Sequence, residues 1–65
     1  MQIILNGESI ELDNQVNIVQ LLSQLEISGR LAVEVNQRII PRSLFPTYEI
    51  ESGDNVEIVE AIGGG

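Results

Sequence analysis

Apolar and polar residues alternate at the start of the chain, which is the pattern of a half-buried strand. Ile3 and Leu5 share one face of an expected first strand, and Ile10 and Leu12 share one face of a second. Between them stands Asn6-Gly7, the dipeptide that two-residue type I′ turns prefer. The pattern therefore predicts an antiparallel hairpin at the N-terminus.

The next segment has the period of an amphipathic helix. Asn17 is the expected N-cap, and Gln20, three residues later, completes a capping box. Gly29 is expected to end the helix near C′, where the backbone often needs a left-handed residue. The apolar stripe could be a partner surface, but this spacing is more typical of a core-facing side. The stripe consists of Ile18, Leu21, Leu22 and Leu25.

Three further strands are expected after the helix. Residues 31–35 alternate again, and residues 38–40 form a short strand that ends before Pro41, which has no backbone N–H to donate. Gly53-Asp54 predicts the last turn, and residues 56–61 a final strand. The segment from Arg42 to Tyr48 has no clear period and is expected to be irregular.

This order predicts an α+β fold of the β-grasp type, with a mixed four- to five-stranded sheet packed on one main helix. The first and last strands would be parallel neighbours, joined by a long crossover. Residues 1–61 would form the domain and residues 62–65 a flexible glycine tail. The pleat would place several apolar residues on the open face, where they form a tentative partner surface or are ordinary exposed side chains. These residues are Ile4, Val59, Ala61 and Ile62.

The composition excludes most side-chain catalysis. The chain of 65 residues contains no histidine, cysteine or tryptophan, and its three basic residues are all arginines. It therefore lacks a His-based general base, a thiolate and a Schiff-base lysine. The carboxylates do not follow the spacing of a calcium loop. We expect no catalytic residue, no metal site and no bound cofactor.

The net charge of −7 bears on partners. It repels phosphate, which argues against nucleic acid and anionic membranes. The charge could serve solubility or could steer the protein toward a basic partner surface. No apolar run approaches the roughly 18 residues of a membrane span. We expect a cytoplasmic protein.

The chain ends in three glycines, Gly63, Gly64 and Gly65. Glycine lacks a Cβ, so such a tail could thread a narrow enzyme channel and present the Gly65 carboxylate as the reactive group. A frayed end or an added linker would look the same. The tail alone leaves these alternatives open.

Taken together, the motifs resemble the ThiS family, the sulfur carriers of thiamin biosynthesis with a ubiquitin-like β-grasp fold. The resemblance covers nearly the whole chain. The third terminal glycine, Gly63, departs from the family, in which a larger residue usually precedes the diglycine. The matching motifs are Met1-Gln2-Ile3, Asn6-Gly7, Ala32 to Asn36, Ile40 to Ser43, Gly53-Asp54 and Gly64-Gly65.

The resemblance implies a function for the tail. A partner similar to ubiquitin-activating enzymes would use ATP and magnesium to adenylate Gly65. A sulfur relay fed by a cysteine desulfurase would convert the adenylate to a thiocarboxylate, and Gly63 and Gly64 would thread the partner's channel. Thiazole synthase would then take the sulfur, so the protein would be a co-substrate and not an enzyme.

Other functions agree with the same features. The small subunit of molybdopterin synthase resembles this fold and also ends in a diglycine thiocarboxylate, although it is usually longer. A ubiquitin-like protein modifier is a second alternative, and an inert interaction domain with an acidic surface is a third. Neither the immediate sulfur donor nor the oligomeric state of any complex follows from the residues.

Overall fold

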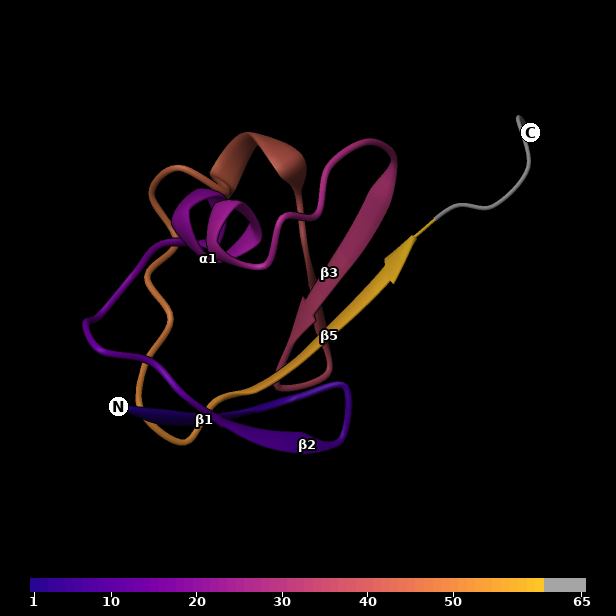
Figure 1. Ribbon diagram of the computed structural model, residues 1–65. Coiled ribbons are helices and arrows are strands. Elements are labelled where there is room, and N and C mark those ends of the chain that lie inside the picture. The colour runs from indigo at the N-terminus through magenta and orange to yellow at the C-terminus, as the bar shows by residue number, and fades with distance from the viewer. Residues whose placement is uncertain (61–65) are drawn as a thin grey trace.

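The computed structural model describes residues 1–60, and residues 61–65 lie outside the described part. A five-stranded mixed sheet curves around one helix, as a β-grasp fold requires (Figure 1). The sheet order is β2-β1-β5-β3-β4. The elements are β1 (Gln2–Leu5), β2 (Glu8–Glu11), α1 (Ile18–Gln24), β3 (Leu31–Val35), β4 (Arg38–Ile40), the 3-10 helix η1 (Arg42–Leu44) and β5 (Asn55–Glu60).

The N-terminal hairpin has the predicted turn. Asn6 and Gly7 both have positive φ angles, 48° and 85°, as a type I′ turn requires. The turn sets the register in which Ile3 pairs with Ile10. At the open end of the hairpin, the N-terminal ammonium group of Met1 lies 2.6 Å from a carboxylate oxygen of Glu11.

Helix α1 begins as predicted but ends differently. The Asn17 side chain accepts a hydrogen bond from the Gln20 N–H, and the Gln20 side chain accepts one from the Asn17 N–H. The prediction that Gly29 ends the helix is wrong. Glu26, with a φ of 56°, occupies the left-handed C′ position. Its N–H bonds to Ser23 O and the next N–H to Leu22 O, the two hydrogen bonds of a Schellman motif.

Strand β5 occupies the middle of the sheet. It runs parallel to β1, with Leu5 opposite Val56, and antiparallel to β3, with Val33 opposite Ile58. The parallel pairing of the first and last strands confirms the crossover expected from the sequence. Because β5 is the last strand of the described chain, the C-terminal residues follow directly from the central strand.

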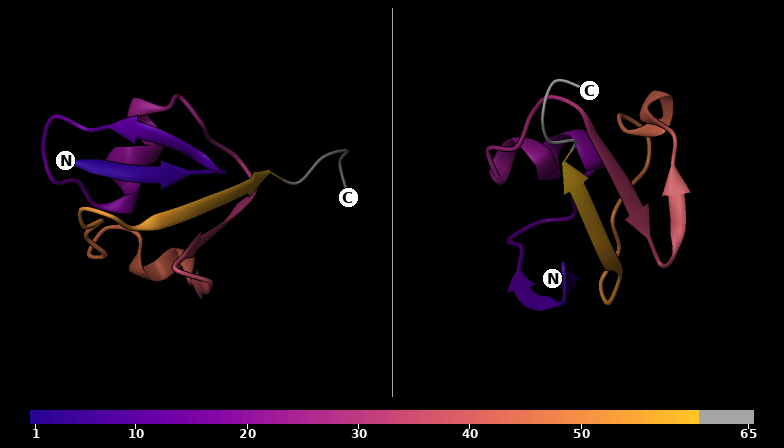
Figure 2. Two further views of the ribbon diagram at one scale, coloured as in Figure 1. Left: turned by 90° about the horizontal axis from the view of Figure 1, so that it is seen from below. Right: turned by 90° about the vertical axis from the view of Figure 1, so that its right-hand side faces the viewer.

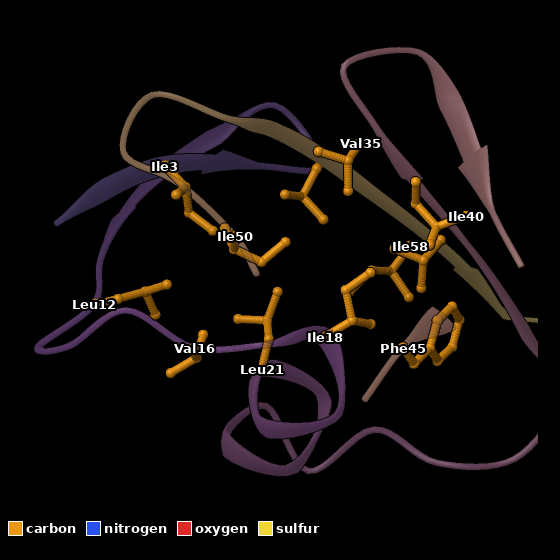
Figure 3. Close-up of a cluster of buried hydrophobic side chains, with 12 residues drawn as sticks. Ile3, Leu12, Val16, Ile18, Leu21, Val35, Ile40, Phe45, Ile50 and Ile58 are labelled. Carbon is orange, nitrogen blue, oxygen red and sulfur yellow. The ribbon is translucent and has the colours of Figure 1, made fainter. Parts of the chain in front are cut away.

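The core lies between the sheet and α1 (Figure 3). Ile50 is fully buried although it belongs to no regular element. Its N–H donates to Val16 O at 2.8 Å, which ties the irregular segment to the chain that enters α1. The buried residues are Ile3, Leu12, Val16, Ile18, Leu21, Val33, Val35, Ile40, Phe45, Ile50, Val56 and Ile58.

Helix α1 has seven residues. Within residues 1–60, no helix has the length and apolar content that crossing a bilayer requires.

Candidate functional site

The C-terminal end of β5 carries the segment in which the sequence places the reactive group. Glu60 is the last described residue and lies opposite Leu31, the first residue of β3. The predicted modification site Gly65 and the threading residues Gly63 and Gly64 lie outside the described residues, as do Ala61 and Ile62 of the predicted partner surface. The described part of the site is therefore the end of β5 and the sheet face around it.

The open face of the sheet holds the other two residues of the predicted partner surface. Ile4 is 36% exposed and Val59 is 62% exposed. The structure does not bring them together. Ile4 lies opposite Asn55, four residues before Val59 along β5, which corresponds to about 13 Å at about 3.3 Å per residue. Glu57 lies between them on the same face.

Val59 has an apolar neighbour on β3 instead, and a further apolar side chain shares the face on β4. Its cross-strand partner is Ala32, which is exposed. Ile39 lies one strand further, opposite Glu34, and is 72% exposed. No sequence pattern points to Ala32 or Ile39, because their places on this face depend on the register between strands. The face therefore combines Ala32, Ile39 and Val59, which we call the apolar face residues.

Two glutamates lie within this face. Glu34 and Glu57 are direct cross-strand partners on β3 and β5, so their side chains leave the sheet about 5 Å apart. Neither forms an ion pair with another residue in the described range. The arrangement is a patch of negative charge flanked by apolar side chains, which complements a surface with both apolar and basic groups.

A separate hollow of about 420 Å³ lies on the helix side of the sheet. Its lining includes Leu22, Phe45 and Arg42. The Arg42 guanidinium group donates to the Gly29 carbonyl at 3.0 Å and lies 5.8 Å from the centre of the Phe45 ring. Among the described residues, no group of three or more acidic side chains is placed to hold a metal ion.

The fold and the position of its C-terminal strand define a class of protein, the small ubiquitin-like β-grasp proteins. The crystal structure of the thiamine biosynthesis protein ThiS from Geobacter metallireducens matches with a TM-score of 0.87 at 30% identity, over 100% of both chains. The ThiS family model matches residues 3–65. The chain belongs to the ThiS family.

Two relatives differ in length. The sulfur carrier protein ThiS of Escherichia coli is 29% identical over 66 residues, which cover 100% of both chains. A thiazole synthase of Paramagnetospirillum magneticum is 36% identical over 66 residues, which cover 100% of this chain and 20% of the relative. The chain thus spans a fifth of the length of that thiazole synthase.

Proposed function

We propose that the protein is a sulfur carrier of thiamin biosynthesis and that Gly65 carries the sulfur as a thiocarboxylate. The family match, which extends through residue 65 and so includes the terminal glycines, carries the proposal. The similarity to the sulfur carrier protein of Escherichia coli and to the Geobacter structure supports the same role.

The chemistry takes place on the terminal carboxylate. A carboxylate is a poor acyl donor, so a partner similar to ubiquitin-activating enzymes uses ATP and magnesium to form the acyl-adenylate and release pyrophosphate. The persulfide of a relay that a cysteine desulfurase supplies then attacks the acyl carbon and displaces AMP, which gives an acyl disulfide. A thiol reductant cleaves its S–S bond and releases the thiocarboxylate, with the relay's other sulfur leaving as a thiol. The chain contributes no histidine, cysteine or lysine to these steps. It acts as a co-substrate of other enzymes.

Thiazole synthase is the proposed acceptor of the sulfur. The matching segment within the thiazole synthase of Paramagnetospirillum magneticum supports this pairing, because there both parts belong to one protein. A donor domain within the acceptor's own chain has a high effective concentration at the acceptor. A carrier domain on a chain of its own needs a docking surface for the same encounter. A cytoplasmic location stays a prediction.

We assign that docking to the open face of the sheet. Ala32 and Val59 supply exposed apolar area near the end of β5, and Ile39 adds more on β4. Glu34 and Glu57 between them favour a partner with a basic group at the matching position. A domain docked through this face would hold the end of β5 against the partner, and residues 61–65 would begin there.

Intact-mass analysis tests the proposed function. The protein is incubated with its adenylating enzyme, ATP, magnesium, a cysteine desulfurase, cysteine and a thiol reductant such as dithiothreitol. We expect a mass increase equal to the replacement of one oxygen by one sulfur. The chain without Gly64 and Gly65 is the control and should stay unchanged. If the full chain also keeps its mass in the presence of the active enzymes, the carrier function is wrong.

A further inference from the structure

Two asparagines in the hairpin turns contact the central strand. Asn6 lies in the turn between β1 and β2, and Asn36 in the turn between β3 and β4. Both have left-handed backbones, with φ angles of 48° and 52°. Both direct their side-chain amides to backbone groups of β5. The two turns thus contact β5 from its two sides.

Asn36 acts at the start of β5. Its side-chain oxygen accepts a hydrogen bond from the Asn55 N–H at 3.0 Å, and its backbone N–H donates to the Asn55 carbonyl at 2.8 Å. Its side-chain nitrogen donates to a carboxylate oxygen of Asp54 at 3.0 Å. These bonds secure the end of β5 that lies far from the C-terminus.

Asn6 acts near the other end of β5. Its backbone N–H donates to the Val56 carbonyl at 2.9 Å, which is the last backbone contact of the β1 side. Its side-chain oxygen then accepts from the Ile58 N–H at 2.8 Å, and its side-chain nitrogen donates to the Ile58 carbonyl at 3.4 Å. The side-chain amide therefore continues the ladder by one peptide after the chain has turned away at Gly7.

This contact spans 52 residues of sequence and lies two residues before the end of the described chain. Figure 2 (left view) shows β1 and β5 running in the same direction, with the β1–β2 turn at the end of β1 that points toward the C-terminus. Without the amide, the Ile58 N–H and carbonyl would have no partner on the β1 side. A strand end that is paired along one edge only opens more readily than a strand paired along both.

We propose that Asn6 is a positioning residue for the carrier reaction. By fixing Ile58, it fixes the place and direction in which Glu60 leads into residues 61–65. The proposal rests on the proposed function, because only a reactive C-terminus makes this direction matter. Holding a reacting group in the attack geometry lowers the entropy cost of reaction. Asn6 therefore acts through β5 and makes no contact with the reacting atoms itself.

Glycine substitutions separate the effect of the side-chain amide from the effect of the turn conformation. Glycine adopts positive φ without strain, so Asn6→Gly keeps the type I′ turn and removes only the side-chain hydrogen bonds. Asn36→Gly removes the same kind of contact at the opposite end of β5 and is the matched control. Asn6→Asp keeps the acceptor for the Ile58 N–H and loses the donor to the Ile58 carbonyl.

The first measurement is amide hydrogen exchange of the free protein. We expect Asn6→Gly to raise the exchange rate of the Ile58 amide at least about fivefold, from the loss of one to two hydrogen bonds. Asn36→Gly should raise the rate at Asn55 and leave that at Ile58 within about twofold, because the sites are separate. An unchanged Ile58 rate in Asn6→Gly would overturn the proposal.

The second measurement is the steady-state rate of ATP–pyrophosphate exchange with the adenylating enzyme, at a temperature at which circular dichroism shows all variants folded. We expect Asn6→Gly to lower kcat about fivefold or more with little change in KM, because the domain still docks but presents its carboxylate less often. Asn36→Gly should stay within about twofold of the parent, and Asn6→Asp should lie between the parent and Asn6→Gly.

The outcomes separate the two proposals. If the parent is adenylated and Asn6→Gly reacts with the same kcat, the positioning role is wrong and the carrier function stands. If Asn6→Gly changes only KM, as a loss of folded protein would, the positioning role is also wrong. A parent that is never adenylated overturns the carrier function and, with it, the positioning role.

Discussion

Glu34 and Glu57 face each other across β3 and β5 on the open face of the sheet. Like charges directly opposite each other destabilise an antiparallel pair. The fold therefore gains nothing from this pair, whereas a docking partner with a basic group would relieve the repulsion.

Replacing one of these glutamates should stabilise the free domain. We expect Glu57→Gln to raise the free energy of unfolding by a few tenths to about 1 kcal/mol at low ionic strength. The gain should shrink in high salt, which screens exposed charges. Urea denaturation at two salt concentrations measures both effects. Glu8→Gln removes an exposed charge opposite Leu5 and is the control. If Glu8→Gln stabilises as much as Glu57→Gln, the pair has no specific repulsion.

Replacing Glu26 with glycine should raise the stability of the folded domain. It holds the left-handed C′ position of α1 with a φ of 56°, a conformation that costs a non-glycine residue about 1 kcal/mol. We expect Glu26→Gly to stabilise by about 0.5 to 1 kcal/mol, despite the greater entropy of glycine in the unfolded chain. Thermal unfolding followed by circular dichroism measures the change. Glu26→Ala is the control, and an equal gain from alanine would contradict the backbone explanation.

Ile50 should contribute as much to the free energy of unfolding as a buried residue in a helix or strand. Its side chain is fully buried, so Ile50→Ala should lower the free energy of unfolding by about 2 to 5 kcal/mol. Leu44→Ala is the comparison because Leu44 is 46% exposed, and it should cost under about 1.5 kcal/mol. Both values come from urea denaturation. Similar losses in the two variants would mean that the burial of Ile50 contributes little in solution.

Single charges on the open face should weaken partner binding. We expect Val59→Asp and Ile39→Asp each to raise the Kd for thiazole synthase about tenfold, because a carboxylate would replace apolar contact area beside the existing glutamates. Calorimetric titration measures the affinity. Val19→Asp is the control, because it changes a side chain on α1 that is 46% exposed. The Kd of this variant should stay close to that of the parent. If it weakens binding equally, the docking face is not the open side of the sheet.

A larger residue in the terminal diglycine should block the reaction without affecting the domain. We expect Gly64→Val to abolish detectable adenylation, since a β-branched side chain would not pass a channel shaped for glycine. The melting temperature should match the parent's. ATP–pyrophosphate exchange and circular dichroism provide the two measurements. Adenylation of Gly64→Val at the parent rate would show that the channel is not narrow.

Local signals made most of the fold predictable. Asn6-Gly7 and the Asn17–Gln20 capping box act within a few residues, and both appear in the structure. The helix end was predicted wrongly because the left-handed C′ residue is Glu26 and not Gly29. The hydrogen bonds to the Ser23 and Leu22 carbonyls close the helix there without a glycine.

The candidate site was less predictable, because it depends on contacts between distant segments. Ile39 shares a face with Val59 only through the register of three strands. Asn6 and Ile58 are 52 residues apart in the sequence, and no local sequence pattern predicts their contact. The burial of Ile50 could not be predicted, because its segment has neither a helical nor a strand period.

The central place of β5 has a mechanical consequence. A partner that draws the C-terminus into its own channel exerts a pull along β5, parallel to the strands on both sides. Such a pull shears the hydrogen bonds to β1 and β3 together and does not open them one by one, as peeling an edge strand would. The domain should therefore resist extraction forces better than a fold whose C-terminal strand lies at an edge.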